Sequence, residues 1–136
     1  MKVVVDTNVV FAALANRKGA AFKIFQRFFR GQFDWITSPP ILEEYRGVLN
    51  LSQKVSTTSV HIFLHLLSKL SIMVEITGNL EVCKDPDDNK FLETAMVGGA
   101  NFLVTKNLKH FPRKHYAGVR IVNVATFLTE LEKAST

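Results

Sequence analysis

The sequence predicts a three-layer α/β/α fold around a central parallel sheet, and three observations support this prediction. Short runs of β-branched and other apolar residues, typical of buried strands, recur along the chain. Segments with helical spacing separate these runs, and strands that alternate with helices form parallel sheets covered on both faces. No repeat, low-complexity tract or flexible linker divides the 136 residues. We therefore predict one domain spanning residues 1–136.

Five runs have the composition expected of strands. The first is Val-Val-Val at residues 3–5, which ends abruptly at the polar Asp6. The other runs cover residues 33–36, 72–76, 102–105 and 119–122. Ligands of parallel α/β sheets bind beyond the carboxyl ends of the strands. The residues that follow each run are therefore the candidate functional residues.

Five helices are expected between and after these runs. Residues 19–30 carry a stripe from Phe22 to Phe29 at helical spacing, which we expect to form core or a partner-binding face. A second helix begins at Pro39-Pro40 and runs to residue 49, since proline is tolerated in the first helical turn. The remaining helices are expected at residues 56–70, 87–97 and 125–132.

The composition favours a cytoplasmic protein with an anionic partner. Seventeen Lys and Arg against twelve Asp and Glu give a net charge of +5, which favours nucleic acid as a partner. The single cysteine, Cys83, excludes an internal disulfide and a multi-cysteine zinc site and fits a reducing compartment. No signal peptide or membrane span is expected. The absence of G-x-G-x-x-G and G-x-x-x-x-G-K-[ST] motifs argues against nucleotide-dependent enzymes.

Asp6 and Glu44 are the first two candidate site residues. Asp6 directly follows the first strand, where this architecture places its ligands, and Asn8 is able to hydrogen-bond it; the alternative is a helix cap. On the helix at residues 39–49, Glu44 flanks the apolar stripe, whereas the adjacent Glu43 lies nearly opposite it. Glu44 can therefore reach the rim of the sheet, although periodicity is equally compatible with a solvated flank residue.

Three aspartates open the helix expected at residues 87–97. Acidic residues favour the amino-terminal end of a helix, so Asp85, Asp87 and Asp88 are compatible with capping alone. Asp88 differs because it shares the inward face with Phe91, three residues on. Asp87 lies at the edge of that face, and Asp85 precedes the helix. A buried acid is costly unless it is paired or binds a cation, so Asp88 is the strongest candidate of the three.

Together, Asp6, Glu44 and Asp88 predict a divalent metal centre. Carboxylates gathered at one sheet edge repel by about 4 kcal/mol per close pair at an effective dielectric constant of about 20. Mg²⁺ or Mn²⁺ relieves this repulsion, because both ions prefer oxygen ligands and retain waters. Such an ion polarises a phosphoryl oxygen and lowers the pKa of a bound water, which phosphodiester hydrolysis requires.

Polar and basic residues follow the strand expected at residues 102–105. Thr105 and Asn107 are able to orient a water or a ligand, but turn chemistry explains both equally well. The candidate nucleic-acid-binding residues of this segment are Lys106, Lys109, Arg113 and Lys114. Their excess over nearby acidic residues favours contact with phosphate, and a solvated face is the alternative.

Four motifs occur in the order and with the separations of a PIN domain: VVVDTN at 3–8, SPPILEEY at 38–45, DPDDNKFL at 85–92 and LVT at 103–105. The chain resembles this family end to end, and within it the toxins of bacterial and archaeal toxin-antitoxin systems related to VapC. The resemblance implies a parallel sheet of about five strands and a Mg²⁺- or Mn²⁺-dependent endoribonuclease that is commonly dimeric and is inhibited by a cognate antitoxin.

The same resemblance assigns site residues. It places the three acids of the family on Asp6, Glu44 and Asp88, in agreement with the helical-wheel positions. A frequent fourth acid falls on Asn107, where an amide replaces the carboxylate and weakens one metal position.

The leading hypothesis is metal-dependent hydrolysis of RNA, in which the three acids hold the ion and basic residues hold the RNA backbone. The alternative is a catalytically weak or inactive module on the same scaffold that binds RNA or a protein partner. A DNA-directed nuclease also stays open, since net charge does not distinguish the two polymers.

Overall fold

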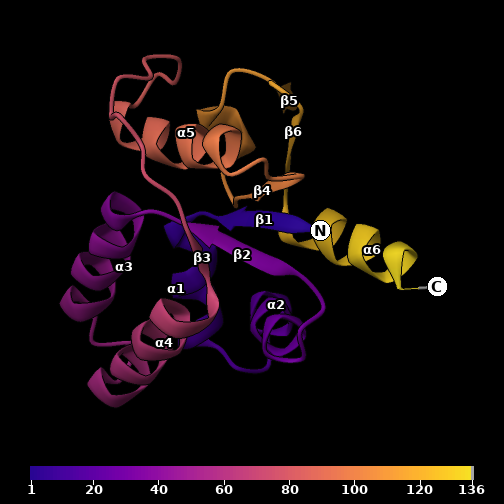
Figure 1. Ribbon diagram of the computed structural model, residues 1–136. Coiled ribbons are helices and arrows are strands. Elements are labelled where there is room, and N and C mark those ends of the chain that lie inside the picture. Colours follow the sequence, from indigo (N-terminus) through magenta and orange to yellow (C-terminus); the bar gives the residue numbers. More distant parts are fainter. Residues whose placement is uncertain (136) are drawn as a thin grey trace.

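The structure, a computed structural model, describes residues 1–135 and contains six strands, six α-helices and two short 3₁₀ helices (Figure 1). In chain order the elements are β1 (Lys2–Val5), α1 (Thr7–Ala15), α2 (Ala20–Phe29), β2 (Asp34–Thr37), α3 (Pro39–Leu51), α4 (Thr57–Leu70), β3 (Ile72–Met73), η1 (Pro86–Asp88), α5 (Asn89–Val97), β4 (Phe102–Val104), η2 (Leu108–His110), β5 (His115–Tyr116), β6 (Val119–Val122) and α6 (Val124–Ala134).

The six strands form one sheet in the order β3-β2-β1-β4-β6-β5. All neighbouring strands are parallel except β5 and β6, which are antiparallel. The chain moves from β1 to β2 and β3 on one side, and then returns to place β4 on the other side of β1. The strand order therefore reverses between β1 and β4, and such a switch point leaves a crevice at the carboxyl ends of the two strands.

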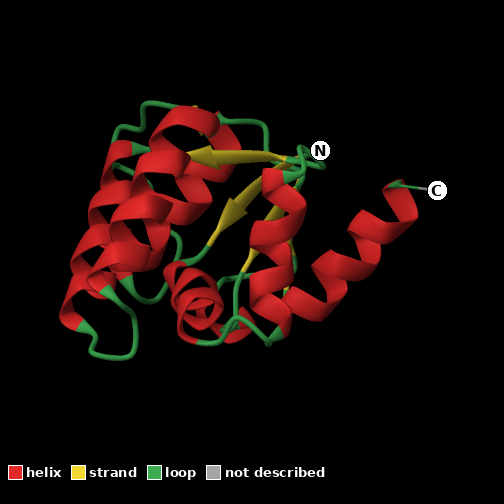
Figure 2. Cartoon of the chain, turned by 90° about the horizontal axis from the view of Figure 1, so that it is seen from below, coloured by secondary structure: helices red, strands yellow, loops and turns green. Residues whose placement is uncertain are grey.

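Helices cover both faces of the sheet, which confirms the predicted α/β/α class. Helix α5 lies on one face, over β1 and β4, whereas α1 and α2 lie on the other (Figure 1). Helix α6 lies at the edge of the molecule and carries the C-terminal end (Figure 2). Within residues 1–135, no helix is long and apolar enough to cross a membrane.

An aromatic cluster fills the core between the sheet and α2 and α4. Trp35 of β2 is fully buried, and its ring centroid lies 5.8 Å from those of Phe25 and Phe63, which stack on each other at 4.8 Å. Burying each of these side chains stabilises the fold by about 1.5 to 3 kcal/mol. The phenylalanine stripe of α2 is only partly core: Phe28 is buried, but Phe29 is 44% exposed.

Helix α1 is the main element that the sequence analysis did not identify. Its nine residues, TNVVFAALA, are almost uniformly apolar after Asn8, so they lack the alternation of apolar and polar faces that marks an amphipathic helix. The uniformity reflects its position, because Val9, Val10 and Ala13 are fully buried. A helix covered on most sides has no polar face to show in its sequence.

The edges of the sheet also differ from the prediction. Strand β3 is limited to Ile72–Met73, whereas residues 72–76 were expected, and both side chains are more than 40% exposed at the sheet edge. Strand β5 was not expected and makes the sheet six-stranded. It joins β6 through Ala117 and Gly118, whose φ angles of 50° and 83° are the two positive values that a type I′ hairpin turn requires.

Candidate functional site

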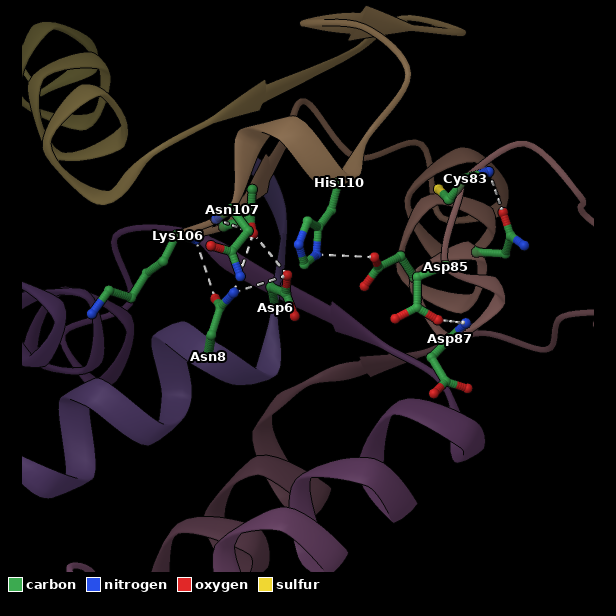
Figure 3. A network of polar contacts seen from close by, with 11 residues as sticks. Asp6, Asn8, Cys83, Asp85, Asp87, Lys106, Asn107 and His110 are labelled. Carbon is green, nitrogen blue, oxygen red and sulfur yellow. Dashed lines mark hydrogen bonds and ion pairs between the residues drawn. The ribbon is translucent and has the colours of Figure 1, made fainter.

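A cavity of about 650 Å³ opens at the carboxyl ends of β1 and β4, at the switch point of the sheet. It gathers Asp6, which directly follows β1, with residues of α1, α3, η1 and the segments before η1 and after β4, and Figure 3 shows most of them from close by. The lining residues are Asp6, Thr7, Asn8, Phe11, Glu44, Val48, Asp85, Asp87, Asp88, Lys106, Asn107 and His110. The three predicted metal ligands therefore line one cavity, although they lie far apart in the sequence.

Asp6 follows β1 directly and is 6% exposed. It stands at the N-cap position of α1, but its carboxylate makes no capping hydrogen bond. Oδ2 instead accepts hydrogen bonds from the hydroxyl of Thr105 at 2.7 Å and from Nδ2 of Asn8 at 3.4 Å (Figure 3). Burial and the charge of Glu44 raise the pKa of Asp6, and the Thr105 hydrogen bond opposes them in part.

Thr105 and Asn8 tie the loop after β4 to Asp6. The Thr105 hydroxyl, which donates to Asp6, also accepts a hydrogen bond from the backbone N–H of Asn107 at 3.1 Å. Oδ1 of Asn8 accepts from the backbone N–H of Lys106 at 3.2 Å. These contacts fix the orientation of the Asp6 carboxylate and bring the side chains of Asn107 and Lys106 to the cavity.

Glu44 lies on α3 and is half-buried, whereas the adjacent Glu43 is exposed, as the helical wheel predicts. Both carboxylate oxygens of Glu44 have partners. Oε2 accepts a hydrogen bond from the hydroxyl of Thr7, and Oε1 accepts one from the ammonium of Lys90 at 2.7 Å. Glu44 thus lines the cavity, while the ammonium of Lys90 contacts its carboxylate from another side.

Asp88 is the most isolated of the three carboxylates. It ends η1, is 8% exposed, and its Oδ2 atom has no hydrogen-bond partner among the described residues. Nδ1 of His110 lies 3.3 Å from this oxygen, an ion-pair distance without hydrogen-bond geometry. Burial, with the charges of Asp6, Asp85 and Glu44, raises the pKa of Asp88 to about 6, and His110 opposes the shift.

The other two aspartates of the segment lie at the exposed rim. Oδ1 of Asp85 accepts a hydrogen bond from the backbone N–H of Asp87 at 3.0 Å, so Asp85 caps η1 as the capping alternative predicts. Asp87 is exposed and is one of the residues that line the cavity. The local structure is a 3₁₀ turn followed by α5 from Asn89, whereas the sequence analysis expected one helix from residue 87. Proline at the first position of this turn favours its start there.

The basic residues divide into two groups. Lys106 lines the cavity, and so does His110, which the sequence analysis did not assign to the site. Lys109, Arg113 and Lys114 are exposed on the same segment but do not line the cavity. The sequence analysis also missed Lys90, because its contact with Glu44 joins residues 46 positions apart and no local pattern marks it.

The donor atoms suit a hard divalent cation, although the carboxylates are not preassembled around one. Oxygen donors are the ligands that Mg²⁺ and Mn²⁺ prefer, and the unpartnered Oδ2 of Asp88 is such a donor. Within residues 1–135, however, no three or more His, Cys, Asp or Glu side chains are arranged as a metal-binding group. The structure thus brings Asp6, Glu44 and Asp88 to one cavity, and their role as metal ligands stays a prediction.

Comparisons with known proteins agree with this architecture. The uncharacterized protein MJ1680 of Methanocaldococcus jannaschii is 29% identical over 145 residues, an alignment that covers 98% of this chain and 93% of that protein. A chain in the crystal structure of VapBC2 from Rickettsia felis, bound to a DNA fragment from their promoter, shares the fold with a TM-score of 0.57. That alignment covers 90% of this chain and 98% of the other at 14% identity.

The family comparison covers most of the chain. The family model described as PIN domain matches residues 2–109, a range that includes every residue lining the cavity except His110. With the reversed strand order and the acidic cavity at the switch point, this match shows that the chain belongs to the PIN domain family.

Proposed function

We propose that this chain is a Mg²⁺- or Mn²⁺-dependent endoribonuclease that hydrolyses RNA phosphodiester bonds. The proposal rests on Asp88, whose buried Oδ2 accepts no hydrogen bond within residues 1–135 and borders a cavity that Asp6 also lines. A buried carboxylate without a hydrogen bond is costly; His110, half exposed and 3.3 Å away, offsets this cost only in part, and a divalent cation supplies the remaining interaction. Membership of the PIN domain family supports a nuclease, and the net charge of +5 supports a polyanionic substrate.

The residues of the cavity would have different roles in such a reaction. When bound, a divalent cation supplies Lewis-acid chemistry to a phosphodiester and lowers the pKa of a water. Asp6 and Asp88 would hold it, with Glu44 as the third carboxylate. Thr105 keeps Asp6 oriented and favours its charged form. Lys106, exposed at the cavity, is placed to contact a backbone phosphate.

Cleavage of a generic single-stranded RNA with Mg²⁺, with Mn²⁺ and with EDTA tests this proposal. Asp6→Asn and Asp88→Asn are expected to abolish metal-dependent cleavage, whereas Glu43→Gln on the exposed face of α3 is expected to leave it unchanged. A DNA of the same sequence added as competitor shows which polymer is preferred. Full cleavage by both aspartate variants would refute the assignment.

A second candidate function is a catalytically weak or inactive module that binds RNA or a protein partner. The observation that favours it is the engagement of Glu44 by Lys90 and Thr7, together with the lack of a preassembled metal-binding group within residues 1–135. This candidate predicts salt-sensitive RNA binding without turnover. Cleavage products that vanish with EDTA and with Asp6→Asn would eliminate it.

We further propose that the chain acts in the cytoplasm, as one domain, as the homodimeric toxin of a toxin-antitoxin pair. Its fold similarity to a chain of VapBC2 supports this role, and so do the exposed apolar side chains of Leu51, Ile62 and Leu70, which a protein partner would cover. Light scattering tests the dimer. Induced expression alone and together with the product of a neighbouring small gene tests toxicity and its relief.

A further inference from the structure

Lys90 forms an ion pair with Glu44 that joins α5 to α3. Its Nζ atom lies 2.7 Å from Oε1 of Glu44, and both side chains are 22% exposed. Partial exclusion from water strengthens such a pair relative to a fully exposed one, because solvent screens the two charges less. The pair is therefore stronger than an ion pair of two fully exposed side chains.

Lys90 reaches Glu44 from outside the acidic cavity. It lines a neighbouring hollow of about 310 Å³ together with Asn89 and Glu93, and it is absent from the lining of the acidic cavity. Glu93 does not compete for it, because that carboxylate accepts hydrogen bonds from Thr77 and Gly78. The ammonium thus sits behind Glu44 and leaves the space between Asp6 and Asp88 open.

The buried and half-buried charges of the site balance with one divalent cation. Asp6, Glu44 and Asp88 carry three negative charges, and Lys90 supplies one positive charge directly to Glu44. Asp85, Asp87 and Lys106 also line the cavity, but they are exposed, so solvent and salt screen their charges. For the four inner groups, one divalent cation brings the sum to zero, whereas a second would leave an excess of two positive charges in a partly buried site. At the end of β4, the neutral Asn107 adds no charge that would offset this excess.

We propose that Lys90 is a positioning residue that acts as a built-in counter-cation for Glu44, so that the site takes up one divalent cation and not two. This inference rests on the metal dependence contained in the proposed function. In this role, the ammonium of Lys90 supplies positive charge that a second metal ion would otherwise supply. Lys90 does not contact the substrate.

The test counts bound Mn²⁺ ions and requires no RNA. Free Mn²⁺ is measured by electron paramagnetic resonance during titration of the wild-type chain, Lys90→Met and Lys90→Arg. Methionine keeps the unbranched apolar stem without the charge, and arginine keeps the charge. We expect one ion per chain for the wild type and for Lys90→Arg. For Lys90→Met we expect a second bound ion, because the positive charge that opposed it is gone.

Each result decides the proposal. Two ions on the wild-type chain, no ion at all, a single ion on Lys90→Met, or a second ion on Lys90→Arg would overturn it. Circular dichroism checks the fold of each variant, and Lys90→Gln replaces Lys90→Met if the latter does not fold. A wild-type chain that binds one Mn²⁺ but cleaves no RNA would remove the proposed function and leave the role of Lys90 intact.

Discussion

The hydroxyl of Thr105 donates a 2.7 Å hydrogen bond to Oδ2 of Asp6, a residue 99 positions earlier in the chain. The pairing of β1 with β4 creates this contact, because Val5 and Val104 are partners in the register and each is followed by one of the two residues. Burial raises the pKa of Asp6, and the Thr105 hydrogen bond is the largest opposing influence. Thr105 therefore favours the charged form of the carboxylate that a cation needs.

Replacement of Thr105 by valine keeps the shape of the side chain and removes its hydroxyl. Hydrogen bonds to charged groups are worth about 1.5 to 3 kcal/mol. We therefore expect Thr105→Val to bind Mn²⁺ at least about tenfold more weakly than the wild type does at pH 7. Thr105→Ser retains the hydroxyl and is the control. Equal Mn²⁺ affinity of Thr105→Val and the wild type would show that the hydrogen bond does not support the charged carboxylate.

Asp88 is expected to lower stability at neutral pH in the absence of metal. Its pKa in the folded chain, raised to about 6 by burial and nearby negative charges, lies above the ordinary value near 4. The folded state thus prefers the protonated form, and stability decreases as the pH rises from about 4 through 6. Asp88→Asn should therefore raise the free energy of unfolding at pH 7.5 in EDTA by on the order of 2 kcal/mol.

Thermal denaturation of the wild type and Asp88→Asn in EDTA measures this effect. The gain should fall to a small fraction of this value at pH 4, where Asp88 is protonated in the folded chain and about half protonated in the unfolded chain. Asp87→Asn, at the exposed rim, is the matched control and should change stability little at either pH. A gain that is the same at pH 4 and pH 7.5 would contradict the electrostatic cause.

Glu93 gives the free energy of unfolding the opposite pH dependence to that given by Asp88. Its 7% exposed carboxylate accepts hydrogen bonds from the backbone N–H and hydroxyl of Thr77 at 2.7 and 2.8 Å and from the N–H of Gly78 at 3.1 Å. Burial alone would raise the pKa of Glu93, but these hydrogen bonds outweigh it and the pKa is lowered. The stabilisation is present above the ordinary glutamate pKa and is lost as the pH falls through the lowered value.

Glu93→Gln is expected to cost about 1 to 3 kcal/mol of unfolding free energy at pH 7, because buried donors lose a charged acceptor. Urea denaturation at pH 7 and at pH 4 measures the loss, which should be smaller at the lower pH. Glu43→Gln provides the exposed control. A Glu93→Gln chain as stable as the wild type at pH 7 would refute this role.

Lys106 is expected to contact a phosphate of bound RNA. Lys106→Ala should weaken RNA binding in EDTA and reduce the slope of log affinity against log salt by about 0.7, the value for one phosphate contact on a single strand. Lys54→Ala, in the exposed connection between α3 and α4, is the control. Fluorescence anisotropy at several salt concentrations gives the slope, and an unchanged slope for Lys106→Ala would exclude the contact.

The sequence predicted the position of a site residue correctly where that position depends on a local pattern of neighbouring residues. The abrupt end of Val-Val-Val predicts the strand-end position of Asp6, and the helical wheel separates half-buried Glu44 from exposed Glu43. Asp88 is buried as its spacing to Phe91 predicts, even though the local turn is 3₁₀. These residues obey rules that need only a few neighbours in the chain.

The remaining features depend on contacts that no local pattern records. Helix α1 lacks a polar face because it is buried, so periodicity fails where burial is greatest. The ion pair of Lys90 with Glu44 joins separate helices, and the turn at Ala117 places a residue other than glycine or asparagine at positive φ. Such features follow from the packed structure as a whole.

Asp6 and Asp88 are expected to hold one divalent cation between them. Anomalous diffraction from crystals soaked in MnCl₂ locates such an ion, with Asp88→Asn crystals as the control. We predict a manganese peak in contact with both carboxylates in the wild type and none at this position in Asp88→Asn. A wild-type cavity without manganese, or manganese bound away from both carboxylates, would contradict the claim.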